Sequence, residues 1–404
     1  MDWLLTNGQL KTGKVDIGLK DGRIAAVEPA GMGLQLAEAQ NSRDLAGWVV
    51  LPGLIDAHTH LDKTFATLEN DSGTLGEALD VWRRVHQNRT AADIATAATK
   101  AIKLAIVNGV TAMRSHIDIN APNQLLPVEV LLGLRDQFKD QIELQLVGLG
   151  TSAGEKKYLD GMHAALAMGV DLVGGCPALC PDPKAEIDAV FELAEQTGKP
   201  IDLHVDETED PQMLSLEYLA DKTIAHGMQG RVTAGHCCSL AFAADEDAER
   251  IIDKVAAAQI NIVTLPSCNL VLMGRNMRPV PRGTTRVKEL LAAGVNVCAA
   301  SDNVHDPFNP FGNYDLLQIG NLNAHTAHMT GVAELEECLS MVTQRAANTL
   351  GTINHTIAVG CAADLVVLNS THYEDAILAP PARLMTFKNG NLLVESKIEQ
   401  TWYV

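Results

Sequence analysis

The chain has 404 residues, of which 47% are hydrophobic, and a formal net charge of −19 at pH 7. This hydrophobic fraction is enough to bury a large core, and it excludes a globally disordered chain. The strongly negative charge argues against nucleic acid or an anionic membrane as a partner. The first residues do not form a basic, apolar leader, and no apolar run is long enough to span a bilayer, so we expect a cytoplasmic protein.

Eight cysteines are scattered through strand-like and helical stretches rather than arranged as a regular framework. This pattern is typical of reduced thiols in a cytoplasm. Two close pairs, Cys176 with Cys180 and Cys237 with Cys238, raise the alternative of a structural zinc site. A second pair at zinc-finger spacing does not follow either of them, which disfavours that alternative.

The two ends of the chain have the same pattern of short strands separated by turns. Residues 1–50 carry short alternating strands broken by Asn7-Gly8 and Asp21-Gly22, and the C-terminal end repeats this pattern around Asn389-Gly390. Asn-Gly between apolar runs is a strong hairpin signal. We therefore predict one small β-sandwich domain built from residues 1–50 and 355–404.

Residues 51–354 alternate helical stretches with short apolar strands, which predicts a parallel sheet. Glycines such as Gly169 and Gly198 follow the helical stretches, where a left-handed cap is needed. We expect eight strands, near residues 50–57, 110–119, 142–150, 170–175, 200–206, 231–237, 260–266 and 295–302. Eight such units predict an α/β fold of the (β/α)8 TIM-barrel type. The alternative, a doubly wound open sheet, would carry a glycine-rich phosphate turn after its first strand, and the sequence has none there.

The first of these strands runs into Asp56-Ala57-His58-Thr59-His60. Two imidazoles one residue apart on a strand point to the same face, so both can reach one metal ion. The alternative is a pair of hydrogen-bonded core histidines, although a buried strand has no structural need for two polar rings on one face.

Polar residues also follow other predicted strands, at the barrel end where chemistry is expected. They are His116 and Asp118 after the second strand, His204 and Glu207 after the fifth, His236 after the sixth, and Ser301-Asp302-Asn303 after the eighth. Four or five such coincidences are hard to produce by chance. They indicate one shared site.

Three imidazoles and a carboxylate make the best ligand set: His58, His60, His204 and Asp302. These ligands suit zinc or iron, with manganese also possible. Two-metal enzymes of this architecture often need a lysine at the end of strand 4, and residues 170–177 contain none, so we expect one divalent metal ion. A water in the remaining position would become a nucleophile near neutral pH.

Three further residues lie close in sequence to the ligands or after another predicted strand. Glu207 can face the same cavity and protonate a ring nitrogen of the substrate, and its alternative is a loop salt bridge. His236 can hydrogen-bond the attacking water, or else serve as a fourth imidazole ligand or a neighbour of the ligands. Lys63 is expected to cap the helix or loop after the first strand.

The chain resembles the amidohydrolase superfamily, and within it the bacterial cytosine deaminase branch, over nearly its whole length. The matching stretches are His58-Thr59-His60-Leu61-Asp62-Lys63-Thr64, Gly73-Thr74-Leu75, Arg114-Ser115-His116-Ile117-Asp118, His204-Val205-Asp206-Glu207, Val232-Thr233-Ala234-Gly235-His236, Arg286-Val287-Lys288-Glu289-Leu290-Leu291, and Ser301-Asp302-Asn303 with Asp306-Pro307-Phe308. The same branch includes enzymes that remove alkylamines from s-triazines, such as N-isopropylammelide amidohydrolase.

The resemblance implies a role for each matching position. His58, His60, His204 and Asp302 would hold the metal. Glu207 would carry a proton to the ring nitrogen, and His236 with Asp302 would orient and deprotonate the water. Leu75 would line the substrate pocket.

Three pocket positions depart from cytosine deaminase. Thr151 stands where that enzyme has a glutamine that reads the amide edge of the pyrimidine, and threonine does not offer the same paired donor and acceptor. Asn303 replaces a second aspartate, and Phe308 replaces a tryptophan. The resemblance therefore predicts the hydrolytic machinery and leaves the substrate open.

Together these observations predict a mononuclear metal-dependent hydrolase that deaminates a small nitrogen heterocycle, either a cytosine-like pyrimidine or a related amino-heterocycle, and releases ammonia. One alternative is hydrolysis of a cyclic amide or an N-alkylamino-s-triazine in the same site. A second is a non-catalytic barrel that serves as a scaffold. We also expect a homo-oligomer.

Overall fold

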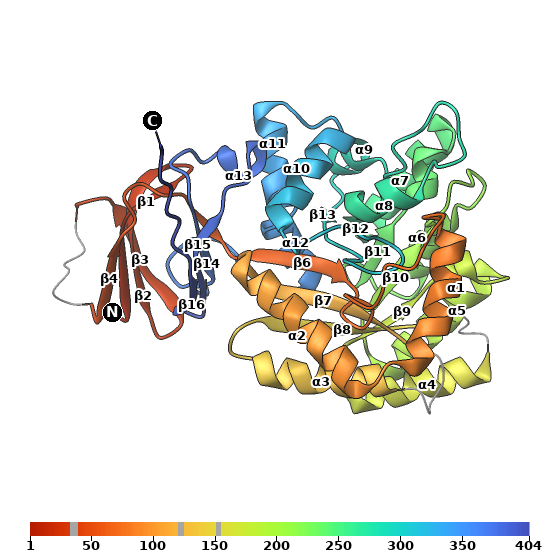
Figure 1. Cartoon of the computed structure of the whole chain (residues 1–404). Helices are drawn as coiled ribbons and strands as arrows, with labels where there is room; N and C mark the ends of the chain where they lie inside the picture. Colours follow the sequence, from red (N-terminus) through yellow and green to blue (C-terminus); the bar gives the residue numbers. More distant parts are fainter. Residues whose placement is uncertain (33–38, 120–124, 151–154, 404) are drawn as a thin grey trace.

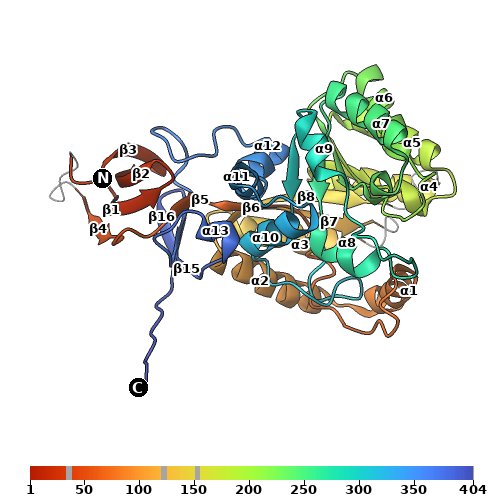
Figure 2. The ribbon, with the colours of Figure 1, turned by 90° about the horizontal axis from the view of Figure 1, so that it is seen from above.

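The computed structural model describes residues 1–32, 39–119, 125–150 and 155–403. Figure 1 shows strands from both ends of the chain gathered at one side of the molecule, with the barrel and its helices at the other. In Figure 2 the C-terminal segment extends away from these terminal strands. None of the helices in the described ranges is long and apolar enough to cross a membrane.

The terminal strands form two four-stranded sheets, counted over the described residues. The first sheet contains β1 (Trp3–Leu10), β2 (Gly13–Lys20), β3 (Arg23–Pro29) and β4 (Asn41–Asp44), and the second contains β5 (Val50–Pro52), β14 (Leu365–Leu368), β15 (Arg383–Lys388) and β16 (Asn391–Glu395). Leu5 and Ile17 of the first sheet and Leu365 and Phe387 of the second belong to one buried apolar cluster. The sheets therefore pack face to face, as in a sandwich.

The barrel strands follow one another around a parallel sheet in chain order, which is eight strands in the described part of the chain. They are β6 (Leu54–Thr59), β7 (Val110–Asp118), β8 (Glu143–Leu149), β9 (Leu172–Gly175), β10 (Ile201–Val205), β11 (Val232–His236), β12 (Asn261–Thr264) and β13 (Val297–Ala299). Sequential order with every neighbour parallel is the barrel arrangement predicted from the sequence, and it excludes the doubly wound alternative.

The segment after β13 closes the barrel against β6. Thr59 and Asp302 form an isolated parallel bridge, and the Asp302 amide donates to the His58 carbonyl at 2.9 Å. The buried Asp56 carboxylate accepts hydrogen bonds from both the amide and the hydroxyl of Ser301. This closure brings the ends of the first and last strands of the barrel together.

Helices surround the sheet (Figures 1 and 2). They are α1 (Leu75–Val85), α2 (Ala91–Val107), α3 (Leu126–Phe138), α4 (Lys156–Met168), α5 (Pro183–Thr197), α6 (Ser215–Ala225), α7 (Asp245–Ala257), α8 (Pro266–Leu272), α9 (Val287–Ala292), α10 (Leu316–Thr326), α11 (Val332–Ser340), α12 (Gln344–Leu350) and α13 (Asp375–Leu378). Gly169 and Gly198 follow α4 and α5 with φ of 116° and 68°. The predicted left-handed caps are confirmed at both positions.

The strand predicted over residues 50–57 is two strands. It breaks at Gly53, so that β5 pairs with β14 of the sandwich and β6 pairs with β7 of the barrel. A Cβ at Gly53 would lie 2.2 Å from the Thr111 hydroxyl oxygen, so the backbone passes too close for any larger residue. The domain bounds of 1–50 with 355–404, and of 51–354, stay predictions, although the pairing places Val50–Pro52 in the sandwich.

Candidate metal centre and active site

The four predicted ligands lie at or just past the carboxyl ends of three strands. His58 lies near the end of β6 and His60 directly follows it, while His204 lies in β10 and Asp302 comes after β13. Asp302 has a φ of 59°, in the left-handed region that non-glycine residues seldom adopt. The strain is located at the point where the barrel closes, and such strain clusters at functional sites.

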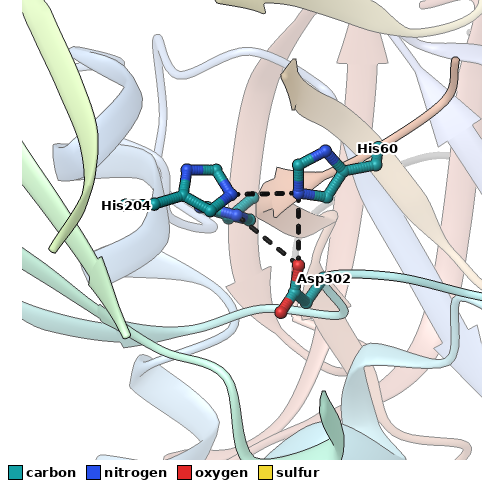
Figure 3. A group of neighbouring side chains, drawn as sticks. His60, His204 and Asp302 are labelled. Atoms are coloured by element: carbon teal, nitrogen blue, oxygen red, sulfur yellow. Dashed lines mark hydrogen bonds and ion pairs between the residues drawn. The ribbon is translucent and has the colours of Figure 1, made fainter. Parts of the chain in front are cut away.

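The four side chains converge. One ligand atom of each of His58, His60, His204 and Asp302 lies within 4.8 Å of those of the others, and all four residues are buried. His60 Nε2 lies 3.1 Å from His204 Nε2 and 3.3 Å from Asp302 Oδ1, and Figure 3 shows these groups directed toward one another. His58 Nε2 approaches Asp302 Oδ1 to 3.6 Å.

The chemistry of this cluster suits a cation. Both ring nitrogens of His58 and both carboxylate oxygens of Asp302 are buried without a hydrogen-bond partner among the described residues. Burial lowers the pKa of His58, His60 and His204 well below the ordinary value, so these rings are neutral and their lone pairs are available. Buried polar atoms that lack hydrogen bonds are costly, and a divalent metal ion would satisfy them together.

A second group of potential ligands lies behind the first. The rings of His116 and His58 are 4.0 Å apart between centroids, and Asp202 completes this group. Arg114 Nη1 donates to Asp202 Oδ2 at 2.7 Å, so this carboxylate already has a cationic partner. Neither group of potential ligands in the described residues includes a cysteine, and the alternative of a thiolate zinc site gains no support.

His236 and Glu207 stand beside the cluster. The amide of Asn269 donates to His236 Nδ1 at 3.0 Å, so the hydrogen of the neutral ring is on Nε2. His236 Nε2 lies 4.0 Å from Asp302 Oδ2. Glu207 Oε1 lies 3.4 Å from His236 Nδ1. Burial, together with the charge of Asp302, raises the pKa of Glu207 well above its usual range, and burial lowers the pKa of His236 to about 3. Glu207 therefore retains its proton and His236 is neutral.

Asn269 was missed by sequence reasoning. It lies in α8, three residues past the end of the seventh predicted strand, in Pro266-Ser267-Cys268-Asn269. A polar residue beyond a strand end is a common feature, and this one carries no spacing that sets it apart. Only the approach of α8 to β11 gives it a role.

A cavity of about 70 Å³ adjoins the cluster. Of the residues predicted to bind substrate, Leu75, Asn303 and Phe308 line it, as do Glu207 and His236. Thr151 lies outside the described residues. Phe308 packs with Trp82 and Ala78 in a small apolar cluster, which gives the cavity an aromatic wall suited to a flat ring.

Asn303 has a structural reason to be an amide. Its Nδ2 donates to Asp306 Oδ2 at 2.6 Å, and the other oxygen of Asp306 accepts from the Phe308 and Asn309 amides. Asp306 thus fixes both the Asn303 side chain and the turn that carries Phe308. A carboxylate at position 303 would face the carboxylate of Asp306 instead.

The expectation for Lys63 was wrong. Its ammonium does not cap the following loop but lies 2.6 Å from Asp118 Oδ1 and 3.3 Å from His60 Nδ1, on the lining of the cavity. The sequence placed Lys63 just past a strand, and the direction of its side chain depended on the neighbouring β7, where Asp118 lies.

A family model described as the amidohydrolase family matches residues 85–402. The chain belongs to this family. An amidohydrolase named pterin deaminase from Rhizobium rhizogenes is 34% identical over 392 residues, which cover 95% of this chain and 88% of the relative. The family resemblance inferred from the sequence motifs is confirmed, and members of the family act on C–N bonds.

Solved structures agree with this assignment to the amidohydrolases. The 5-methylcytosine deaminase of Klebsiella pneumoniae, liganded with 5-fluorocytosine, is 30% identical and superposes with a TM-score of 0.93, covering 100% of this chain and 99% of that one. N-isopropylammelide isopropylaminohydrolase of Burkholderia multivorans is 27% identical, with a TM-score of 0.86, and the match covers 97% of this chain and 98% of that one.

Proposed function

We propose that this amidohydrolase is a mononuclear metal-dependent aminohydrolase. It hydrolyses the bond between a ring carbon and an exocyclic amino group of a small nitrogen heterocycle and releases ammonia. The observation that carries the proposal is the position of a protonated Glu207 and a neutral His236 at one cavity beside the convergent His58, His60, His204 and Asp302. The scaffold alternative loses support because a scaffold has no need for buried, unpartnered ligand atoms.

His58, His60, His204 and Asp302 would hold one divalent ion, zinc, iron or manganese. When bound, such an ion supplies Lewis acidity that makes a water nucleophilic near neutral pH. A single ion fits the lack of a lysine after β9, where residues 170–177 contain none.

Glu207 and Asp302 carry out the proton transfers, and His236 orients the water. Glu207 donates its proton to a ring nitrogen next to the amino-bearing carbon, which makes that carbon more electrophilic. The Nε2 hydrogen of His236 orients the attacking oxygen, since Asn269 fixes this tautomer. Asp302 accepts a proton from the water. The new C–O bond forms, Asp302 passes the proton from the water to the exocyclic nitrogen, and the C–N bond breaks to release ammonia. Glu207 takes back a proton from the new hydroxyl group, which becomes the ring carbonyl.

The names of the relatives support this substrate class, because two of them are deaminases of heterocycles. Similarity to N-isopropylammelide isopropylaminohydrolase favours a second candidate, in which an alkylamine leaves a triazine ring in the same site. The two differ in the leaving group and share the proton transfers described above. The homo-oligomeric state and the cytoplasmic location stay predictions, and light scattering would test the former.

The decisive experiment is a screen for ammonia and alkylamine release over pyrimidines, purines, pteridines, s-triazines and cyclic ureides, with metal analysis of the same protein preparation. We expect about one equivalent of zinc, iron or manganese per chain, and turnover of an amino-heterocycle. Stoichiometric metal without release of ammonia or amine from any ring would contradict the proposed reaction. A protein that takes up no transition metal would contradict the ligand set.

A further inference from the structure

The cavity wall beside His60 carries a largely buried ion pair. Lys63 follows β6, Asp118 ends β7 and Trp82 lies in α1, and all three line the cavity that also borders His60 and Glu207. Lys63 Nζ lies 2.6 Å from Asp118 Oδ1, and Trp82 Nε1 donates to Asp118 Oδ2 at 2.6 Å. The Asp118 backbone amide in turn donates to Asp62 Oδ2 at 3.0 Å. Three elements therefore hold this carboxylate in one place.

The pair keeps hydrogen-bonding capacity toward the cavity. Lys63 Nζ forms an ion pair with the Asp118 carboxylate, and the side chain is therefore an ammonium. An ammonium has three hydrogens, of which Asp118 takes one. His60 accepts none, because its Nε2 atom faces the ligand cluster and a neutral ring then carries its hydrogen on Nδ1. Each Asp118 oxygen accepts one bond here and has room for another. One side of the cavity thus presents a donor beside an acceptor.

The other polar groups of the described lining have roles or partners apart from this pair. The Asn303 amide donates to Asp306, and His236 and Glu207 stand at the reacting end beside the ligand cluster. A buried ion pair is expensive to desolvate and is weak as a purely structural tie. Trp82 and Phe308 flank it, with both ring centroids 5.8 Å from Lys63 Nζ.

We propose that Lys63 and Asp118 recognise a lactam edge of the substrate, that is, a ring carbonyl next to a ring N–H. The Lys63 ammonium donates to the carbonyl oxygen, and the Asp118 carboxylate accepts from the N–H. Trp82 positions Asp118 by holding its second oxygen. The inference rests on the proposed function and narrows its substrate class to oxo-substituted amino-heterocycles.

Matched ring pairs test this recognition. Cytosine is compared with 4-aminopyrimidine, and isocytosine with 2-aminopyrimidine, because the second member of each pair lacks the ring carbonyl. The readout is kcat/KM for ammonia release, or the dissociation constant from calorimetry for a ring that is not turned over. For at least one pair we expect wild-type protein to prefer the lactam member by more than about 100-fold, because a buried charged pair left without its partner is penalised.

Lys63→Met should remove most of that preference, with a loss of at least about 10-fold on the lactam member and less than about 3-fold on its partner. This variant leaves the Asp118 carboxylate without a cationic partner, which can prevent folding. In that case the double variant Lys63→Met with Asp118→Asn, which removes both charges, is used for the same test. The matched control is Lys388→Met, which breaks a buried Lys388–Asp364 pair of 2.7 Å in the sandwich. It should leave the preference unchanged.

If Lys63→Met lowers kcat/KM equally for both members of a pair and leaves the preference intact, the ion pair has only a structural role. That result would overturn the inference. Wild-type protein that prefers the member without the carbonyl would also overturn it. Both outcomes leave the proposed function standing, whereas failure of the wild type to release ammonia or an amine from any ring in the wider screen would count against the function itself.

Discussion

The polar groups on the two walls of the cavity differ in whether they have hydrogen-bond partners. On the ligand side, His58 and Asp302 keep buried atoms without hydrogen-bond partners among the described residues. On the other wall, Lys63 and Trp82 each donate to the Asp118 carboxylate at 2.6 Å. Burial alone does not explain the difference, because Lys63 and Trp82 are buried too and only Asp118 is partly exposed.

The difference shows what each wall is built to meet. Unpartnered nitrogen and oxygen lone pairs gathered from separate strands leave a space that a cation would satisfy, and few other ligands would. Partnered groups with spare capacity suit an organic ring, since they remain satisfied when the cavity holds only water. In the proposed function the ligand wall cleaves the bond and the Lys63–Asp118 pair recognises the ring, so variants on each wall should fail in different ways.

The largest effect is expected on the ligand wall. His60→Ala removes one of four ligands, so we expect loss of stoichiometric metal and a fall in turnover by several orders of magnitude. Metal analysis of the dialysed protein and an ammonia assay measure both. His163→Ala, at an exposed position of α4, is the control and should retain metal and rate. Full activity of His60→Ala without bound metal would contradict the proposed role of the cluster.

Glu207→Gln should be nearly as damaging to the rate and should leave the metal in place. The amide keeps the size of the side chain but has no acidic proton, and general acid catalysis typically contributes about 10²–10⁴-fold. We expect a fall of that size in kcat with KM within a few-fold of wild type. Loss of metal together with activity would instead assign Glu207 to the ligand set.

Asn303→Asp should have the smallest effect on the rate and a clear one on stability. Its new carboxylate would face Asp306, replacing a 2.6 Å hydrogen bond with a repulsion between like charges. We expect the free energy of unfolding to fall by about 2 kcal/mol at pH 8, measured with denaturant.

The exchange of both residues provides the control. In Asn303→Asp with Asp306→Asn, an amide again donates to a carboxylate, and its oxygen can still accept from the Phe308 and Asn309 amides. At least half of the lost stability should return. A double variant no more stable than the single one would show that the Asn303–Asp306 hydrogen bond does not explain the amide at position 303.

Much of the fold and part of the site could be predicted from the sequence. The alternation of helices and apolar strands determines a (β/α)8 barrel, since eight such units bury their apolar faces by closing on themselves. The barrel then places the carboxyl ends of its strands at one edge, which is why His58, His60, His204 and Asp302 could be grouped although up to 244 residues separate them. A strand period of two puts the first pair on one face.

Only the tertiary structure decided the contacts made across elements. The direction of Lys63 depends on Asp118 in β7, and the tautomer of His236 depends on Asn269 in α8. The need for glycine at position 53 depends on the approach of Thr111. None of these contacts can be recognised in the local sequence, because each joins residues on different elements. The sequence gives the order of those elements along the chain but not how they face one another. Position along a strand is a property of the chain itself, whereas the partner of a long side chain is a property of its packing.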